Sequence, residues 1–195
     1  MRLIFATNNK HKVEEIRSII SDKLEIITLE EAGIHIDIPE PYNTLEENAN
    51  EKSRIIYQLT NTNCFSEDTG LEVDALNGEP GVHSARYAGE EKSFDKNIEK
   101  LLSKLHGNPD RKARFRTFIS LRMDGQEFLF EGICNGKIIE QKRGDMGFGY
   151  DPVFVPEGAG KTFGEMNLEE KNIYSHRRKA MDKLVVFLSH VLNNQ

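Results

Sequence analysis

Cysteine is scarce in this sequence, with only Cys64 and Cys134 among 195 residues. Each stands beside an apolar residue, Phe65 and Ile133 respectively, so we expect two buried free thiols. Neither has neighbours at the spacing of zinc ligands, which argues against a thiolate metal site. A disulfide or a metal pair is the less favoured alternative.

Long apolar runs are also missing. The first six residues, MRLIFA, are mostly apolar, and the chain turns polar at Thr7. That run is too short for the hydrophobic region of a secretory signal, and no other stretch is long enough to cross a bilayer. We therefore expect a protein of the reducing cytoplasm with no membrane partner.

The sequence has no surplus of basic residues, since 26 lysines and arginines face 32 acidic residues, for a net charge of −6. A protein that binds duplex nucleic acid normally carries a basic face, so we expect no nucleic-acid polymer as a partner. An enzyme of free nucleotides is not excluded, because a bound divalent cation can supply the missing positive charge.

No internal repeat, low-complexity tract or linker interrupts the chain. Hydrophobic residues make up 37% of it, which suffices for one packed domain over residues 1–195, or for one domain folded as two lobes. Strand and helix patterns alternate at first, and a long hairpin follows, turning at Asp124-Gly125. We expect an α/β fold with an elongated, mixed central sheet and flanking helices.

Hydrophobic periodicity gives the expected elements. Strands are predicted at residues 3–6, 25–29, 64–66, 114–123 and 127–133, and helices at 10–20, 44–59, 93–105 and 175–192. The second helix should begin with a capping box, in which Thr44 caps the helix and Glu47 reaches back to it. Its buried face should comprise Ala49, Ile55, Ile56 and Leu59.

Four polar segments exceed what a fold alone requires, and the first runs from Thr7 to Lys12. A polar turn that opens a helix presents backbone N–H donors and a positive dipole end, which suits phosphate. Lys12 could add a charge to the same group. An ordinary helix cap with solvated lysines is the alternative, although lysine in a first turn opposes the dipole.

The second segment contains the neighbouring acids Glu67 and Asp68 at the expected end of a strand, with Glu40 elsewhere. Carboxylates followed by Thr69-Gly70 can hold Mg²⁺ through oxygen ligands and waters. One carboxylate could also take a proton from an attacking water. A turn with a capping aspartate is the alternative interpretation.

The third segment, Gly144 to Pro152, has three glycines that let a ligand approach the backbone closely. Phe148 offers a face on which a base can stack, and Asp151 is an acceptor at the loop edge. A flexible loop with one buried aromatic residue is the alternative. Together with the first two segments, this loop predicts a Mg²⁺-assisted phosphate site with an aromatic platform for a base.

The fourth segment, Lys171 to Lys179, gathers five basic or titratable groups where the last helix begins. Cations there oppose the helix dipole, so a bound anion or a polar base edge would explain them. The alternative is a solvated basic face with His176 as a structural histidine. Which bond such a site would break does not follow from these residues.

Five segments, taken in chain order, resemble motifs of the inosine triphosphate pyrophosphatase family. Thr7 to Lys12 is similar to its T-x-N-x-x-K signature, and Ser66 to Val73 resembles its D-D-[ST]-G-L segment. Pro80 to Tyr87 resembles its P-G-[VIT]-x-S-A-R segment. Gly147 to Pro152 and Ser175 to Arg177 are similar to its two base-pocket motifs.

The resemblance implies a two-lobed α/β fold with a substrate cleft between the lobes, and a homodimer. It implies Mg²⁺-dependent hydrolysis of noncanonical purine nucleoside triphosphates (ITP, dITP and XTP) at the α-phosphorus, giving the monophosphate and pyrophosphate and clearing them from the nucleotide pool. A pyrophosphatase for other modified nucleotides and a nucleotide-binding module without turnover are the alternatives.

The resemblance also implies roles for single residues. Asp68 would be the catalytic acidic residue and a Mg²⁺ ligand, with Glu40 as the second ligand. Lys12 would be catalytic and hold the triphosphate, helped by Thr7, Asn9 and Lys171. The remaining substrate contacts would come from Asn8, Lys10, His11, Thr69, Phe148, Gly149, Tyr150, Asp151, His176 and Arg177.

Within that set, Phe148 would stack on the base, while Asp151, His176 and Arg177 would read its edge. Arg177 is a donor only, so it would pair with the 6-keto group of hypoxanthine or xanthine and leave adenine mismatched. The family usually has aspartate where this chain has Glu67. Glutamate keeps the charge but adds a methylene, so its oxygens lie differently around a metal.

Overall fold

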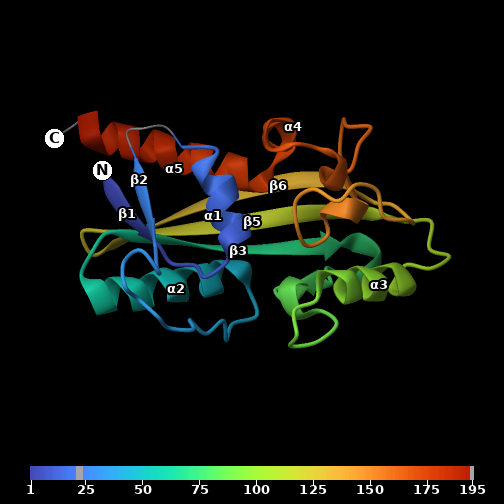
Figure 1. Cartoon of the computed structure of the whole chain (residues 1–195), viewed down its shortest axis with the longest axis horizontal. Helices are drawn as coiled ribbons and strands as arrows, with labels where there is room; N and C mark the ends of the chain where they lie inside the picture. The colour runs from blue at the N-terminus through green and yellow to red at the C-terminus, as the bar shows by residue number, and fades with distance from the viewer. Residues whose placement is uncertain (21–23, 194–195) are drawn as a thin grey trace. The chain divides into compact units, whose positions relative to one another are not determined.

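The computed structural model describes residues 1–20 and 24–193, with side chains as far as residue 191 (Figure 1). These residues form a mixed sheet with the strand order β2-β1-β3-β5-β6-β7, and β4 pairs with β3. The strands are β1 (Arg2–Phe5), β2 (Glu25–Thr28), β3 (Cys64–Val73), β4 (Pro80–Gly81), β5 (Lys112–Met123), β6 (Gln126–Ile138) and β7 (Phe154–Pro156). The helices are α1 (Lys10–Arg17), α2 (Leu45–Thr60), α3 (Phe94–Lys104), α4 (Leu168–Tyr174) and α5 (His176–Asn193).

Strand directions confirm the predicted mixed sheet. β1 pairs in parallel with both β2 and β3. β3 pairs antiparallel with β4, and β6 pairs antiparallel with β7. The connection Asp124-Gly125 joins β5 to β6 with φ of 52° and 80°, the left-handed geometry that a two-residue hairpin turn requires.

The chain divides into two compact units. Unit 1 comprises Met1–Asp68, Thr117–Gly132 and Arg177–Gln195, and unit 2 comprises Thr69–Arg116 and Ile133–His176. The strands β3, β5 and β6 contribute residues to both units. The expectation of a single domain with a substrate cleft stays a prediction.

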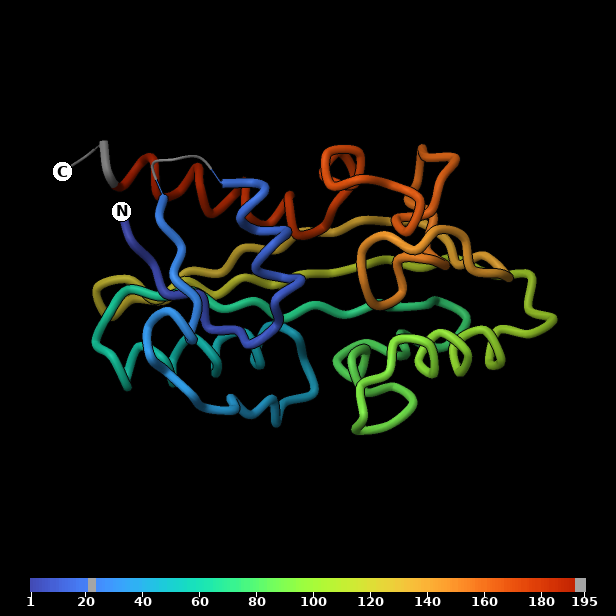
Figure 2. Tube along the Cα trace, viewed as in Figure 1, coloured from blue at the N-terminus to red at the C-terminus, as the bar shows by residue number. Residues whose placement is uncertain are grey.

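Unit 1 has apolar clusters on both faces of its strands. Leu3 and Phe5 of β1 face a cluster that includes α1 and α5, and Phe5 stacks on Phe65 at 4.4 Å. Ile4 and Ala6 point the other way, toward a cluster that includes α2. This alternation follows from the two-residue period of a strand, and Figure 2 shows α2 and α5 on opposite sides of the unit 1 strands.

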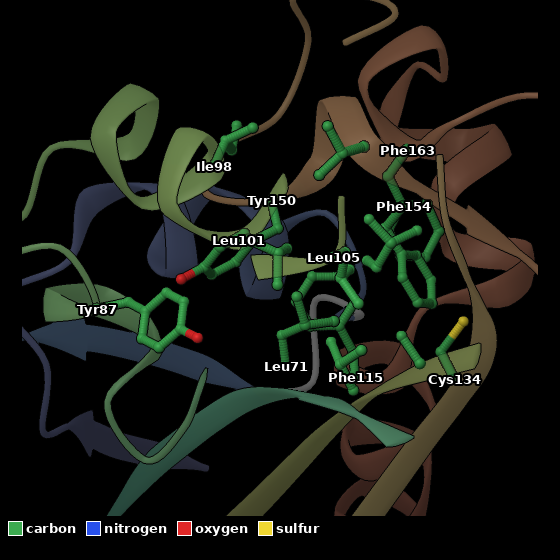
Figure 3. Packing of buried hydrophobic residues seen from close by; sticks show 14 of the residues in the cluster. Leu71, Tyr87, Ile98, Leu101, Leu105, Phe115, Cys134, Tyr150, Phe154 and Phe163 are labelled. Atoms are coloured by element: carbon green, nitrogen blue, oxygen red, sulfur yellow. The ribbon is translucent and has the colours of Figure 1, made fainter. Parts of the chain in front are cut away.

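Unit 2 is organised around an apolar core between α3 and the strands, seen in Figure 3. Its labelled members include Leu71, Leu101, Leu105, Phe115, Phe154 and Phe163. Phe115 and Phe154 meet edge to face with ring centroids 4.7 Å apart. On β5, the residues expected to face inward, from Phe115 to Met123 at every second position, are buried, which confirms the predicted alternation.

The start of α2 confirms one half of the expected capping box. Thr44 caps the helix by accepting a hydrogen bond from the Glu47 backbone N–H. The Glu47 carboxylate, however, accepts from the Thr44 hydroxyl at 2.6 Å and not from the backbone. The predicted buried face was wrong at Leu59, which is 59% exposed, and Ile55 is only partly buried, while Lys52 of the same helix is buried.

The strand predicted at residues 64–66 was too short, because β3 is one continuous strand from Cys64 to Val73, which also rules out the alternative of a turn at Asp68. β3 pairs with β1 only at Cys64 and Phe65, and it also neighbours β5 in the sheet. Glu67 and Asp68 are therefore neighbours within a strand, and both are buried.

Both cysteines are free and buried, as expected. Burial raises the pKa of the Cys64 thiol to about 12, so this group stays protonated near neutral pH. None of the helices among residues 1–20 and 24–193 has the length and apolar character that a bilayer crossing requires.

Candidate active site

The turn before α1 is built from side-chain caps. Asn9 caps the helix by accepting a hydrogen bond from the Lys12 backbone N–H at 3.3 Å. The Thr7 hydroxyl accepts from the Asn9 N–H at 3.2 Å, and the Asn8 amide donates to the Ile36 carbonyl at 3.0 Å. These bonds hold the turn in one conformation at the start of an eight-residue helix.

Within the same turn, Lys10 and His11 are exposed, whereas Lys12 is partly buried and points toward β3. His11 contacts Glu14 at 3.7 Å on the outer side of α1. Among these three residues, Lys12 is the one that contacts an acidic residue of β3, namely Glu67.

Asp68, Glu40 and Lys52 form a triad in unit 1, in which Asp68 and Lys52 are buried and Glu40 is partly exposed. The Lys52 ammonium donates to Glu40 Oε1 at 2.6 Å and to Asp68 Oδ1 at 2.8 Å. Asp68 comes from β3, Lys52 from α2, and Glu40 from the loop before α2. The two predicted Mg²⁺ ligands are thus brought together, although they lie 28 positions apart in the sequence.

The pKa values of the two carboxyl groups are shifted in opposite directions. Burial raises the pKa of Asp68, and the negative charge of Glu40 adds to the rise against the opposing charges of Lys52 and Lys12. Burial acts on Glu40 too, but there the charge and hydrogen bond of Lys52 outweigh it and lower the pKa to about 2. Asp68 is therefore the better proton acceptor of the pair.

This pair suits Mg²⁺ as a partial ligand set. In the part of the chain that the structure describes, no group of three or more His, Cys, Asp and Glu side chains could hold a metal. Mg²⁺ usually keeps several waters and binds one or two carboxylates together with substrate phosphates. Glu40 and Asp68, which already share the cation of Lys52, fit that requirement.

Glu67 lies in a second buried network with Arg177, Glu15 and Lys12. Arg177 binds Glu67 with both edges of its fork, from Nε to Oε2 at 2.6 Å and from Nη2 to Oε1 at 2.8 Å. Its Nη1 donates to Glu15 of α1. Lys12 Nζ lies 3.2 Å from Glu67 Oε1.

Arg177 is not where the sequence led us to expect it. We expected Arg177 to read a base edge together with His176 and Asp151. In the structure Arg177 is 1% exposed, and its guanidinium binds Glu67 and Glu15. At least one cation at the start of α5 is thus explained by contacts within the protein, because Arg177 binds two buried carboxylates.

The glycine-rich loop gathers a separate group in unit 2. Asp151 Oδ2 accepts from the Phe148 backbone N–H at 2.9 Å and from Lys171 Nζ at 2.6 Å. The sequence predicted Asp151 as an acceptor at the edge of the loop. The structure instead buries it inside the loop. Gly147, at φ 74°, has no room for a side chain, since a Cβ would lie 2.1 Å from Asp151 Oδ2.

Lys171 lies beside the predicted base platform. Its ammonium is 5.3 Å from the Phe148 ring centroid, within the range of a cation–π contact. We expected Lys171 to help hold a triphosphate with Lys12, but its contacts are with Asp151 and Phe148.

Two further predicted residues are packed into unit 2. His176 is buried and stacks on Phe115 with centroids 4.7 Å apart. The Tyr150 hydroxyl donates to the Ser84 carbonyl at 2.8 Å, and burial raises its pKa. Thr69 and Gly149 are partly exposed, and a Cβ at Gly149 would meet nothing within 4 Å.

Sequence reasoning missed Lys52 and Glu15. The signal for Lys52 was available, because Ala49, Lys52 and Ile56 share one face of α2 at spacings of three and four residues. A lysine on an apolar helix face needs a buried partner, since charged side chains are rarely buried unpaired. Glu15 gave no comparable signal, because acidic residues on short helices are mostly solvated.

Comparisons with known proteins agree with this arrangement of motifs and fold. Residues 3–187 match the Ham1 family. The chain belongs to this family. A dITP/XTP pyrophosphatase of Porphyromonas gingivalis is 51% identical over 188 residues, covering 96% of this chain and 97% of that protein.

Two other members show the same agreement over nearly the full length. A dITP/XTP pyrophosphatase of Flavobacterium johnsoniae is 49% identical over 189 residues, covering 97% of this chain and 98% of that protein. The structure of the Staphylococcus aureus Ham1 protein superposes with a TM-score of 0.88 at 41% identity, covering 97% of this chain and 99% of that chain. This Ham1 family member therefore has the α/β fold of its relatives.

Proposed function

We propose that this Ham1 family member hydrolyses noncanonical purine nucleoside triphosphates, such as dITP, ITP and XTP, to the monophosphate and pyrophosphate. The observation that carries the proposal is the convergence of Asp68 and Glu40 on the buried Lys52, where the charge of Lys12 also acts on both carboxyl groups. Relatives named dITP/XTP pyrophosphatases, which match over nearly their full length, support the substrate class.

In the proposed reaction, Asp68 orients a water and takes its proton as the water attacks the α-phosphorus. The raised pKa of Asp68 supports this role, because a base accepts a proton more readily when its pKa is closer to neutral. Lys12 binds phosphate oxygens of the substrate. Lys52 keeps the two carboxylates in place through its bonds of 2.6 and 2.8 Å.

We include Mg²⁺ as the cofactor, held by Glu40 and Asp68. When bound, Mg²⁺ supplies positive charge to the phosphate oxygens and to the leaving pyrophosphate. A chain with a net charge of −6 needs such a counter-charge to bind a triphosphate. The test is pyrophosphate release from ITP in buffer stripped with EDTA, where full activity would contradict the proposal.

For the base, we propose that Phe148 stacks on the purine and that Lys171 is a donor to its 6-keto oxygen. Arg177 was first considered for this role; we add Lys171 because its ammonium lies 5.3 Å from the Phe148 ring centroid, and like Arg177 it is buried, with its ammonium paired to Asp151. Lysine has donors only, so it favours hypoxanthine and xanthine over adenine. The 2-amino group of guanine must be rejected by another contact.

The decisive experiment is a turnover panel with ITP, dITP, XTP, GTP, ATP and dUTP, measured as pyrophosphate release. We expect the three noncanonical purines to be hydrolysed far faster than the others. Preference for dUTP would indicate another modified-nucleotide pyrophosphatase. Tight ITP binding without any pyrophosphate would indicate a binding module.

We also propose a homodimer in the cytoplasm. Soluble oligomers are most often two-fold dimers, and two buried free thiols suit a reducing compartment. Light scattering at micromolar concentration should give about twice the 22.3 kDa mass of one chain, and a mass of one chain would contradict the dimer.

A further inference from the structure

Four charged side chains of unit 1 form a continuous series that runs Glu15, Arg177, Glu67, Lys12. Arg177 binds Glu15 through Nη1 and binds both oxygens of Glu67 through Nε and Nη2. Lys12 then lies 3.2 Å from the Oε1 atom of Glu67 that Arg177 also binds at 2.8 Å. Two cations and two anions alternate, so the series is electrically balanced.

Three members of this series are buried, and the fourth, Lys12, is partly exposed. The side chains of Glu67, Arg177 and Glu15 are 0%, 2% and 6% exposed, whereas that of Lys12 is 15% exposed. Only Lys12 reaches toward solvent. A phosphate that approached from solvent would therefore meet Lys12, and the three buried groups would act on it through Lys12.

Glu67 holds the Lys12 ammonium through two of its oxygen atoms. Its ammonium contacts both the Glu67 carboxylate and, at 3.5 Å, the Glu67 backbone carbonyl. The carboxylate can serve as a fixed reference because a guanidinium fork binds both of its oxygens and blocks rotation. Glu15 in turn holds the far side of the fork.

We infer that Arg177 and Glu15 are positioning residues that fix the Lys12 ammonium, through Glu67, in the place where it binds substrate phosphate. The inference rests on the proposed function, in which Lys12 holds the triphosphate. It assigns Glu67 the role of an anchor for Lys12.

The test compares two ligands that each resemble one half of the substrate, inorganic tripolyphosphate and inosine, with affinities measured by calorimetry. Arg177→Lys keeps the charge but removes the fork. We expect it to weaken tripolyphosphate binding roughly tenfold, the size expected for a lost charged hydrogen bond, and to raise KM for ITP similarly. Inosine affinity and the ITP-to-ATP ratio of kcat/KM should not change.

Arg178→Lys is the matched control, because Arg178 is the next residue and its exposed side chain pairs with Asp182 at 2.7 Å on the outside of α5. It should leave both affinities at the wild-type value. Glu15→Gln is the second variant, since it leaves the Arg177 fork on Glu67 intact. It should weaken tripolyphosphate binding in the same direction by a smaller factor, and it answers the question even where Arg177→Lys fails to fold.

A double-mutant cycle with Lys12→Ala separates a positioning role from a general structural one. If Arg177 acts through Lys12, Arg177→Lys should have almost no further effect on tripolyphosphate binding in the Lys12→Ala background. Additive losses would overturn the inference, and so would weaker inosine binding with unchanged tripolyphosphate binding. If Lys12→Ala itself leaves tripolyphosphate binding unchanged, the proposed phosphate role of Lys12 fails first.

Discussion

The ammonium group of Lys52 lies 2.8 Å from Asp68 Oδ1, and the two side chains are only 7% and 9% exposed. A buried carboxylate of this kind can stay charged because a cation in hydrogen-bond contact offsets the loss of water. The same Lys52 also binds Glu40, so removal of any one member changes the charge balance of the other two.

Asp68→Asn should abolish turnover and leave the fold intact. The amide is the same size as the carboxylate but cannot accept a proton from water, and loss of a general base typically costs ~10²–10⁴ in rate. Pyrophosphate release and circular dichroism check the two parts. Asp182→Asn, on an exposed residue of α5, is the control, and near-wild-type activity in folded Asp68→Asn would remove Asp68 from the mechanism.

Lys52→Met should destabilise the protein strongly. It leaves the buried Asp68 and the partly exposed Glu40 without their cation, and breaking a buried ion pair from one side costs about 3–5 kcal/mol. Urea denaturation measures the free energy of unfolding, with the exposed Lys183→Met as the control. An unfolding free energy equal to that of wild type would show that the carboxylates are neutral or hydrated in the folded protein.

Glu40 should contribute to stability in a defined acidic range. Its pKa in the folded protein is about 2, below the ordinary value of 4.5, so its contribution is present above pH 4.5 and lost as the pH falls toward 2. Screening of this partly exposed group limits the contribution to roughly 1–2 kcal/mol. Glu40→Gln should remove it.

The measurement for Glu40 is the unfolding free energy of wild type and Glu40→Gln at a series of pH values. The two curves should differ most near neutral pH and converge in strong acid. Glu46→Gln, on an exposed glutamate in the first turn of α2, is the control. A constant difference at every pH would mean that packing and not charge accounts for the effect.

Phe148→Ala and Lys171→Met should change kcat/KM for ITP and ATP in different proportions. Stacking tolerates any base, so Phe148→Ala should lower kcat/KM for ITP and ATP by similar factors, equivalent to ~1–3 kcal/mol. Lys171→Met should lower it more for ITP than for ATP, because only the 6-keto base accepts its hydrogen bond. The quantity to measure is the ITP-to-ATP ratio, and an unchanged ratio in Lys171→Met would assign base selection to other groups.

Local chemistry predicted the elements well. Thr44 caps α2 as its sequence context indicates, and Asp124-Gly125 forms the expected hairpin turn. The inward alternation along β5 was confirmed as well. Such features depend on residues within a few positions of one another, so they can be inferred from the sequence before any tertiary contact is known.

Tertiary contacts decided the chemistry of the charged groups. Lys52 meets Asp68 across 16 positions of sequence, and Arg177 meets Glu67 across 110 positions. The sequence by itself determined the motifs, the caps, the hairpin and the resemblance to a family. Only the folded chain decided that Arg177 binds two buried carboxylates and that Lys52 joins the two proposed metal ligands, because a buried charge takes its partner from whatever residue packing brings within hydrogen-bond reach.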